Sequence, residues 1–389
     1  MDDDFLLRAV GLAAQAIGLS EPNPRVGCVL VSPSGEVLGQ GHTQQAGGPH
    51  AEVMALRDAE SRGLSVAGAT AYVTLEPCAH HGRTPPCADA LVRAGLGRVV
   101  VALMDPNPLV GGKGVARLRD AGIAVDVVPP THPAAVAAWE LNIGFLSRMV
   151  RHRPWVRMKM AGSLDGRTAL GNGQSKWITG EAARSDGQVW RARAGAVLTG
   201  IGTVLADDPR LDVRAIEVLR QPLRVVLDTH WRTPVDARIW DQPGDALVMG
   251  MPAQDTDPAA HARYQSLVDA GRAVAVMPLD ERRAMAGATA NEGSQRLDLD
   301  AVLAELTRRQ INELHVEAGA RLNAAWIACG LVDEYLIYLA PKLIGPGRAL
   351  ADLPALSDLA EVTTLCFHDA QMVGNDLRVL ARPIGAGAF

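Results

Sequence analysis

The sequence predicts a chain of two α/β domains, and three observations lead to this fold class. The length of 389 residues exceeds the usual size of one domain, 48% of the residues are hydrophobic, and helix-like and strand-like segments alternate through both halves. The net charge of -5 predicts no strong nonspecific attraction to nucleic acid or to anionic membranes. We therefore expect two folded hydrophobic cores.

The first domain is expected to span residues 1–150. Apolar residues recur at helical spacing over residues 3–18, and the prolines within residues 21–24 prevent this helix from continuing. Two β-rich runs, 26–31 and 36–42, flank a Ser-Pro-Ser-Gly turn and predict an antiparallel pair. The remaining elements alternate: we expect helices over residues 50–62, 88–94 and 114–121 and strands over residues 70–75, 98–104 and 123–128.

The second domain is expected to span residues 151–389. Three prolines within residues 129–133 break the alternation, and a helical stretch over residues 134–149 leads to a charged segment at the boundary. A strand over residues 155–161 restarts the pattern. The later elements again alternate: we expect strands over residues 196–199, 224–228, 246–249 and 314–316 and helices over residues 180–193 and 323–328.

The N-terminus and the cysteines indicate the compartment. The first residues are acidic where a secretory signal is basic, and no stretch approaches the roughly 20 apolar residues that cross a bilayer. The five cysteines are few and odd in number, which favours reduced thiols, some of them bound to metal, over a disulfide framework. We expect a cytoplasmic protein.

A metal-binding pattern stands in the first domain. His50 begins a predicted helix, Cys78 follows a predicted strand, and Cys87 begins the next helix. Zinc takes imidazole and thiolate ligands, and a catalytic zinc site leaves its fourth position to water, so three ligands favour catalysis. Glu52 is placed to move protons without binding the metal. This pattern is typical of zinc-dependent hydrolytic deaminases of nucleobases.

Alternatives to this interpretation remain open. A single His-x-Glu motif occurs often by chance, and buried cysteines are ordinary core residues, so only the joint pattern is specific. A deaminase acting on nucleic acid shares the zinc motif. Eight residues separate Cys78 from Cys87 where that class has two, and aromatic content is 4%, with no basic stripe, which speaks against stacking on single strands.

Two glycine-containing corners follow strands of the second domain. Residues 200–207 carry glycines, Thr203 and Asp207, although the G-x-G-x-x-G motif is incomplete; residues 314–320 end a strand in Glu317 and Gly319. Ligands of α/β sheets bind at such strand ends, where backbone N-H groups can hold a phosphate. Each corner alone is more simply an ordinary turn, but two together favour a phosphorylated ligand.

Several segments of the sequence resemble one known family. TLEPCAHHGRTPPCADALVRAG, with EPNPRVGCVLV before it and ALMDPNPLVGGKG after it, closely resembles the deaminase domain of bifunctional riboflavin biosynthesis proteins. KMAGSLDGRTA, SKWITG, AGAVLTGIGTVLADDPRLDVR and VEAGARLNAAWI resemble the reductase domain of the same family. The resemblance implies a cytidine-deaminase-like three-layer domain followed by a dihydrofolate-reductase-like α/β domain.

The resemblance also implies roles for individual residues. It implies that His50, Cys78 and Cys87 bind zinc and that Glu52 is the proton shuttle. It implies NADPH contacts from Ala161, Trp177, Thr203, Asp207 and Gly319. It implies substrate contacts from Asn23, His42, His80, Arg83, Asp105, Asn107, Lys159, Ser175, Arg191, Leu211, Arg214 and Glu317. The alternative for His42 and His80 is a surface or supporting histidine, and the alternative for Arg191 and Arg214 is a solvated surface charge.

The implied activity is a two-step reaction. A zinc-dependent hydrolysis would deaminate 2,5-diamino-6-(5-phosphoribosylamino)pyrimidin-4-one, and NADPH would then reduce the ribosyl group to a ribityl phosphate. The partner is a small phosphorylated pyrimidine, with no nucleic acid and no membrane, and a homodimer through the reductase domain is implied. The alternative is a zinc nucleobase deaminase acting on nucleic acid, with a noncatalytic dimerisation domain.

Overall fold

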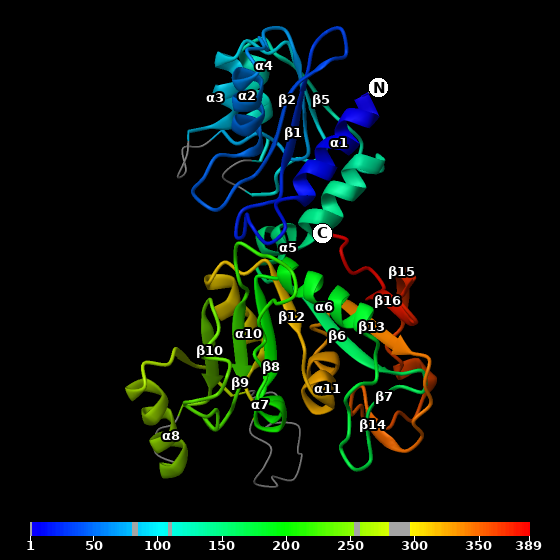
Figure 1. The fold of residues 1–389 in the computed structure, drawn as a ribbon. Coiled ribbons are helices and arrows are strands. Elements are labelled where there is room, and N and C mark those ends of the chain that lie inside the picture. Colours follow the sequence, from blue (N-terminus) through cyan, green and yellow to red (C-terminus); the bar gives the residue numbers. More distant parts are fainter. Residues whose placement is uncertain (1, 80–84, 108–110, 253–256, 280–295) are drawn as a thin grey trace. The chain divides into compact units, whose positions relative to one another are not determined.

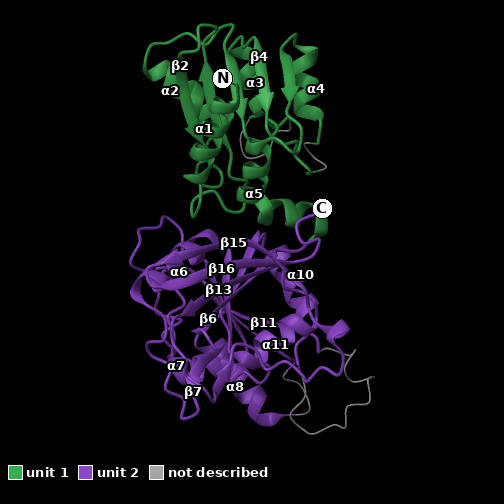
Figure 2. Ribbon diagram, turned by 90° about the vertical axis from the view of Figure 1, so that its right-hand side faces the viewer, with its two compact units in different colours: residues 1–152, 389 green, residues 153–388 purple. Residues whose placement is uncertain are grey.

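The computed structural model divides the chain into two compact units, residues 1–152 with Phe389 and residues 153–388 (Figure 2). It describes residues 2–79, 85–107, 111–252, 257–279 and 296–389. The boundary expected at residue 150 lies in the last turn of helix α5 (Pro133–Arg151). Phe389, expected in the second domain, stacks its ring 5.5 Å from that of Trp139 on this helix.

Unit 1 contains one five-stranded sheet in the order β2-β1-β3-β4-β5. Its strands are β1 (Gly27–Val31), β2 (Val37–His42), β3 (Thr70–Val73), β4 (Arg98–Val101) and β5 (Ala124–Val127). Its helices are α1 (Asp2–Ala14), α2 (Ala51–Ser61), α3 (Cys87–Arg93), α4 (Lys113–Asp120) and α5. β1 pairs antiparallel with β2, as the sequence predicts, while β3, β4 and β5 are parallel to one another.

The helices of unit 1 cover both faces of this sheet and make three layers (Figure 1). On one face Ala55 of α2 and Leu91 of α3 pack with sheet residues such as Val99. On the other face Leu6 of α1 and Ala138 of α5 pack with a second set of sheet residues. Successive strand residues point to opposite faces, so runs that are apolar at every position bury both faces of the sheet. The expected three-layer α/β domain is confirmed.

Unit 2 contains a nine-stranded sheet in the order β11-β10-β9-β8-β12-β6-β13-β16-β15 and a separate pair, β14-β7. Its strands are β6 (Trp155–Ser163), β7 (Arg167–Leu170), β8 (Ala196–Gly200), β9 (Leu223–Leu227), β10 (Ala246–Gly250), β11 (Val274–Val276), β12 (Glu313–Val316), β13 (Glu334–Ala340), β14 (Gly347–Ala349), β15 (Leu365–Val373) and β16 (Asp376–Pro383). Its helices are α6 (Glu181–Arg193), α7 (Ile201–Asp207), α8 (Pro258–Asp269), α10 (Leu299–Arg308) and α11 (Ala320–Ala328), with a short 3-10 helix at Leu359–Glu361.

The large sheet is parallel from β11 to β13 and ends in an antiparallel hairpin, β16-β15. One face packs against α10 and α11, where Trp326 is fully buried. The other face packs against α8 and α6. Helices on both faces of a mostly parallel sheet confirm the predicted α/β class. The hairpin had not been predicted from the sequence.

A network of buried charges lies on the α6 face of this sheet. Arg157 of β6 is 1% exposed and pairs with Glu313 of β12 at 2.8 Å and with Glu334 of β13. Arg193 of α6 pairs with Glu313 at 2.8 Å, and Arg382 of β16 pairs with Glu334 at 2.7 Å. Each buried carboxylate is thus paired with two guanidinium groups, as burial of charge requires.

Among the described residues, no helix is long and apolar enough to span a membrane.

Candidate active sites

Three potential metal ligands converge in unit 1. His50 stands immediately before α2, Cys87 is the first residue of α3, and Cys78 lies between β3 and α3. The Nδ1 atom of His50 is 3.6 Å from the Sγ of Cys78 and 3.3 Å from the Sγ of Cys87. All three ligand atoms lie within 4.8 Å of one another. The structure thus brings the three sequence-predicted ligands together.

These distances fit a tetrahedral zinc ion. Bonds of about 2.0–2.1 Å to nitrogen and about 2.3 Å to sulfur separate the two donors by about 3.5 Å in a tetrahedron. The Cys78 sulfur also accepts a hydrogen bond from the Cys87 backbone N-H at 3.4 Å. Hydrogen bonds from Cys87 and His50 hold the pKa of the Cys78 thiol well below its ordinary value, which favours the thiolate that zinc binds.

Glu52 lies in the first turn of α2, two residues after His50, and is 3% exposed. Burial raises the pKa of its carboxyl group above the ordinary value, and the neighbouring His50 offsets only part of this effect. A carboxyl group in this position can take up and release a proton near a metal-bound ligand without binding the metal itself.

The strand register places further candidates at the same end of the sheet. Gly27 of β1 pairs with His42 at the end of β2, and Cys28 pairs with Val73 at the end of β3. Asn23, in the turn before β1, and His42 therefore lie at the edge of the sheet from which the chain continues to Cys78. His42 is half-buried, and burial lowers its pKa. Ligands of α/β sheets bind at this carboxyl end of the parallel strands.

Asp105 and Asn107 follow β4 at this same edge. Val101 at the end of β4 pairs with Val73, and the Asn107 backbone N-H donates to the Asp105 carboxylate at 2.8 Å. Asp105 is 8% exposed, and burial raises its pKa to about 6, with a smaller contribution from the Glu76 carboxylate. His80 and Arg83, expected to contact substrate, lie outside the described residues.

A cleft of about 990 Å³ opens at the carboxyl ends of the parallel strands of unit 2. It is large enough for a dinucleotide or a substrate of similar size. Several sequence-predicted residues line it, and they come from β6, the β7 region, α7 and the β12–α11 corner: Lys159, Ala161, Ser175, Thr203, Asp207, Glu317 and Gly319.

The glycines of this cleft suit a phosphorylated cofactor. At Gly202 and Gly319, no atom of the described chain lies within 4 Å of the position that a Cβ would take, apart from adjacent residues and each helix's own backbone. A ligand can therefore approach the backbone closely at both corners, one at the start of α7 and one immediately before α11. The residues present thus fit NADPH, which the family resemblance implies.

Glu317 is the most heavily paired acid of the cleft. Arg191 of α6 holds both of its oxygens, with Nε at 2.5 Å and Nη2 at 2.9 Å, and Lys159 lies 3.9 Å away. Burial by itself raises the pKa of this carboxyl group, but Arg191 and Lys159 outweigh burial and hold the pKa well below its ordinary value. Glu317 is therefore ionised, and it connects two predicted substrate contacts.

Four predicted residues lie outside the cleft lining, namely Arg191, Arg214, Leu211 and Trp177. Arg214 pairs with Asp212 at 3.0 Å, and the Asp212 carbonyl accepts a hydrogen bond from Arg191 at 2.9 Å, so Arg214 is linked to the Arg191–Glu317 pair. Leu211 beside them is buried in a left-handed conformation, with φ of 52°. Trp177 is 65% exposed and stacks with Arg184.

The sequence interpretation missed several residues that line the cleft. Thr229 and Arg232 follow β9, and Arg321 and Arg348 reach the cleft from α11 and β14. The strand-end reasoning used for the two glycine corners could have found Thr229, because residues 224–228 were already predicted as a strand. Arg348 could not be found in this way, because its strand pairs with β7 outside the main sheet.

Comparison with known families finds a match for each half of the chain. Residues 1–103 match the family described as cytidine and deoxycytidylate deaminase zinc-binding region. Residues 154–379 match the RibD C-terminal domain.

Whole-chain relatives extend this agreement. Riboflavin biosynthesis protein RibD of Escherichia coli K12 is 42% identical over 97% of this chain and 98% of its own. The Haemophilus influenzae protein of that name is 42% identical over 98% of this chain and 97% of its own. The solved structure of Acinetobacter baumannii RibD, form 1, matches with a TM-score of 0.84 at 42% identity, covering 98% of both chains. A Thermotoga maritima deaminase/reductase matches with a TM-score of 0.81 at 30% identity, also covering 98% of both.

A zinc deaminase fold and a reductase fold in one chain define a bifunctional enzyme, both hydrolase and oxidoreductase. The chain belongs to the RibD family of riboflavin biosynthesis proteins. Zinc and NADPH are its cofactors; zinc is predicted by the ligand pattern, and NADPH is implied by the family resemblance. The alternative of a nucleic-acid deaminase with a noncatalytic second domain is not favoured.

Proposed function

We propose that residues 1–150 deaminate 2,5-diamino-6-(5-phosphoribosylamino)pyrimidin-4-one and that residues 151–389 then reduce the ribosyl group of the product with NADPH. The observation that carries the first step is the His50–Cys78–Cys87 cluster with a buried carboxyl group, Glu52, in the adjacent helical turn. The second step is supported by the glycine-lined cleft of unit 2.

In the deamination, His50, Cys78 and Cys87 would hold the zinc ion, which would supply a water nucleophile that is deprotonated near neutral pH. Glu52, buried in the adjacent helical turn, would accept a proton from the attacking water and deliver it to the departing amine. Asn23, His42, Asp105 and Asn107 hold the pyrimidine and ribosyl groups at the open end of the sheet. The substrate contacts of His80 and Arg83 remain what the family resemblance implies.

In the reduction, NADPH supplies the hydride. Thr203, Asp207 and Gly319 hold the cofactor, with Ala161 and Trp177. Arg214, whose guanidinium is half exposed, holds the substrate phosphate, for which a planar guanidinium is suited. Arg191 contributes to substrate binding through Glu317, whose two oxygens it holds in place. Lys159, Ser175, Leu211 and Glu317 complete the binding of the ribosyl chain.

The experiment that tests the proposal measures both steps on one preparation. With substrate and NADPH, the protein should release one ammonia and oxidise one NADPH per turnover. Glu52→Gln should lower ammonia release by about 10²–10⁴-fold, with zinc still bound and with NADPH oxidation unchanged on substrate deaminated beforehand. Glu60→Gln, an exposed acid on the same helix, is the control. Full deamination by Glu52→Gln would refute the proton shuttle, and ammonia release without NADPH oxidation would refute the reductase assignment.

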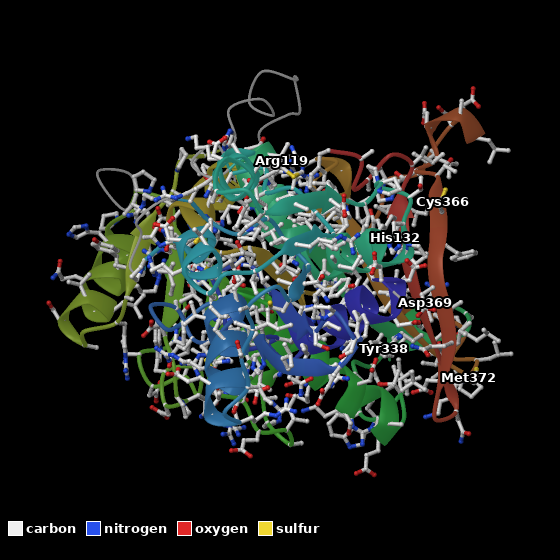
Figure 3. The ribbon with its side chains drawn as sticks, turned by 90° about the horizontal axis from the view of Figure 1, so that it is seen from above. Arg119, His132, Tyr338, Cys366, Asp369 and Met372 are labelled. Carbon is white, nitrogen blue, oxygen red and sulfur yellow. The ribbon has the colours of Figure 1, made fainter. Side chains whose placement is uncertain are left out.

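We also propose that the enzyme is a homodimer through unit 2. β15 is an edge strand of the large sheet, and most of its residues are exposed, with Phe367 at 81% and Met372 at 62%. Figure 3 labels Cys366, Asp369 and Met372 along this strand. A long apolar edge strand favours pairing with a second chain. The need of Cys78 and Cys87 to stay reduced favours a cytoplasmic location for this dimer.

Sedimentation velocity tests the dimer. Phe367→Glu should convert the protein from dimer to monomer, whereas Val268→Glu, on the exposed side of α8, should leave it dimeric. A monomeric wild-type protein, or a Phe367→Glu variant that stays dimeric, would refute the proposed interface.

A further inference from the structure

Glu76 is a buried acid that the deaminase mechanism described above does not use. It stands two residues before the zinc ligand Cys78 and is 3% exposed. Its carboxylate accepts four backbone hydrogen bonds from the segment that follows β4. Oε1 accepts from Gly114 at 2.9 Å and from Val115 at 3.1 Å, and Oε2 accepts from Gly112 at 2.9 Å and from Asp105 at 3.4 Å.

These hydrogen bonds join two segments that are far apart in the sequence. The Glu76 backbone N-H also donates to the Leu103 carbonyl at 2.8 Å, so both the main chain and the side chain of Glu76 bind the same segment. Gly114 lies so close that a Cβ on it would meet the Pro77 carbonyl oxygen at 1.9 Å. The zinc-ligand segment and the start of α4 are therefore in direct contact.

The segment that Glu76 holds contains Asp105 and Asn107. Glu76 binds the Asp105 backbone at one end of the segment and Gly112 at the other. Between them, the Asn107 N-H donates to the Asp105 carboxylate at 2.8 Å, and the Gly111 N-H donates to the Asn107 carbonyl at 2.9 Å. One carboxylate thus fixes both ends of the segment relative to Cys78.

We propose that Glu76 is a positioning residue for deamination, which holds Asp105 and Asn107 at a fixed distance from the zinc ligands. This inference rests on the proposed function, in which these two residues contact the substrate. A carboxylate is suited to the task because its two oxygens accept hydrogen bonds on both sides and it has no donor to oppose four N-H groups.

Glu76→Gln is the first test, because it keeps the size of the side chain and replaces one accepting oxygen by an NH₂ group that faces N-H donors. Misplacement of the segment should raise the KM for ammonia release by about tenfold or more and lower kcat much less. Zinc should remain at one per chain. Glu76→Asp, which keeps both accepting oxygens on a shorter side chain, should have a KM between those of the wild type and of Glu76→Gln. Glu60→Gln is the matched control.

Hydrogen–deuterium exchange gives a readout that does not depend on activity. In Glu76→Gln, amides of residues 103–107 and 111–116 should exchange faster than in the wild type, while amides of α2 should not change. Unchanged KM and exchange would overturn the proposal. Loss of zinc with a proportional fall in kcat would also overturn it, because Glu76 would then support the ligands instead of the substrate contacts.

Asn107→Ala separates this inference from the proposed function. If Asn107→Ala leaves the KM unchanged, the proposed substrate contact is wrong, and the positioning role falls with it. If Asn107→Ala raises the KM but Glu76→Gln does not, the positioning role alone is wrong.

Discussion

Replacement of Arg191 by alanine should destabilise unit 2 strongly. The side chain is 11% exposed and donates two hydrogen bonds to Glu317, at 2.5 and 2.9 Å, and a third to the Asp212 carbonyl at 2.9 Å. Without it, Glu317 would be a buried carboxylate with Lys159 at 3.9 Å and His315 at 3.3 Å as its remaining ion-pair partners among the described residues. The variant therefore leaves a largely uncompensated buried charge.

The size of the effect follows from the burial of the pair. Removal of one partner from a buried ion pair costs about 3–5 kcal/mol. For a domain of this size, each kcal/mol lowers the melting temperature by about 2–4 °C, so we expect unit 2 of Arg191→Ala to melt roughly 6–20 °C lower. Arg191→Lys keeps the charge but cannot hold both carboxylate oxygens in the same planar geometry. Its melting temperature should therefore lie between those of the wild type and of Arg191→Ala.

The effect should also depend on pH. In the wild type the pKa of Glu317 is held well below its ordinary value of 4.5, so the stability that Arg191 contributes is present above about pH 4.5 and is lost as pH falls further. In Arg191→Ala, burial dominates and the pKa of Glu317 rises. Protonation of Glu317 at mildly acidic pH then removes the buried charge that destabilises the variant. The difference in melting temperature should therefore be largest at neutral pH and should narrow toward pH 5.

Differential scanning calorimetry at pH 7.5 and pH 5 measures this difference, with Arg309→Ala as the control for a pair nearer the surface. NADPH identifies the transition of unit 2, because a bound ligand raises the melting temperature of the unit that binds it. An unchanged transition in Arg191→Ala at pH 7.5, or a difference that widens toward pH 5, would refute the assignment of Arg191 as the cation that keeps Glu317 ionised.

Two further predictions concern unit 1. Cys87→Ser should lower the zinc content below one per chain by elemental analysis and abolish ammonia release, while NADPH oxidation on deaminated substrate continues; a full zinc complement would show that Cys87 is not a ligand. Gly114→Ala should lower ammonia release more than tenfold, because its Cβ cannot fit 1.9 Å from the Pro77 oxygen. Gly11→Ala in α1, where the described chain leaves open space, is the control, and equal activities of the two variants would contradict the close contact.

The zinc site could be predicted because its ligands carry their own chemical signal. His50, Cys78 and Cys87 are types that bind zinc, and each stands at the end of an element whose period is readable in the sequence. Glu76 carried no such signal. Its role depends on four backbone N-H groups at residues 105–115, and these become its partners only when β3 and β4 lie side by side.

Prediction of the fold from the sequence is limited in the same way, because some elements depend on contacts that only the assembled sheet creates. Apolar strands such as β8 and β9 were predicted from their composition, because strands of a parallel sheet are buried on both faces. β15 was not, because its residues are mostly exposed and give no clear period. The pairing of Arg157 with Glu313 and Glu334 was equally hidden, since it requires β6 to lie between β12 and β13.

That order of strands gives the buried charges of unit 2 a consequence for folding. Arg157 meets its two carboxylates only when β6 is inserted between two strands that come more than 150 residues later in the chain. A sheet assembled in another order, or shifted by one residue, would leave these groups buried without partners, at a cost of several kcal/mol per ion. Apolar side chains tolerate many neighbours, whereas these charges tolerate few, so we expect the network to restrict the sheet to a single assembly.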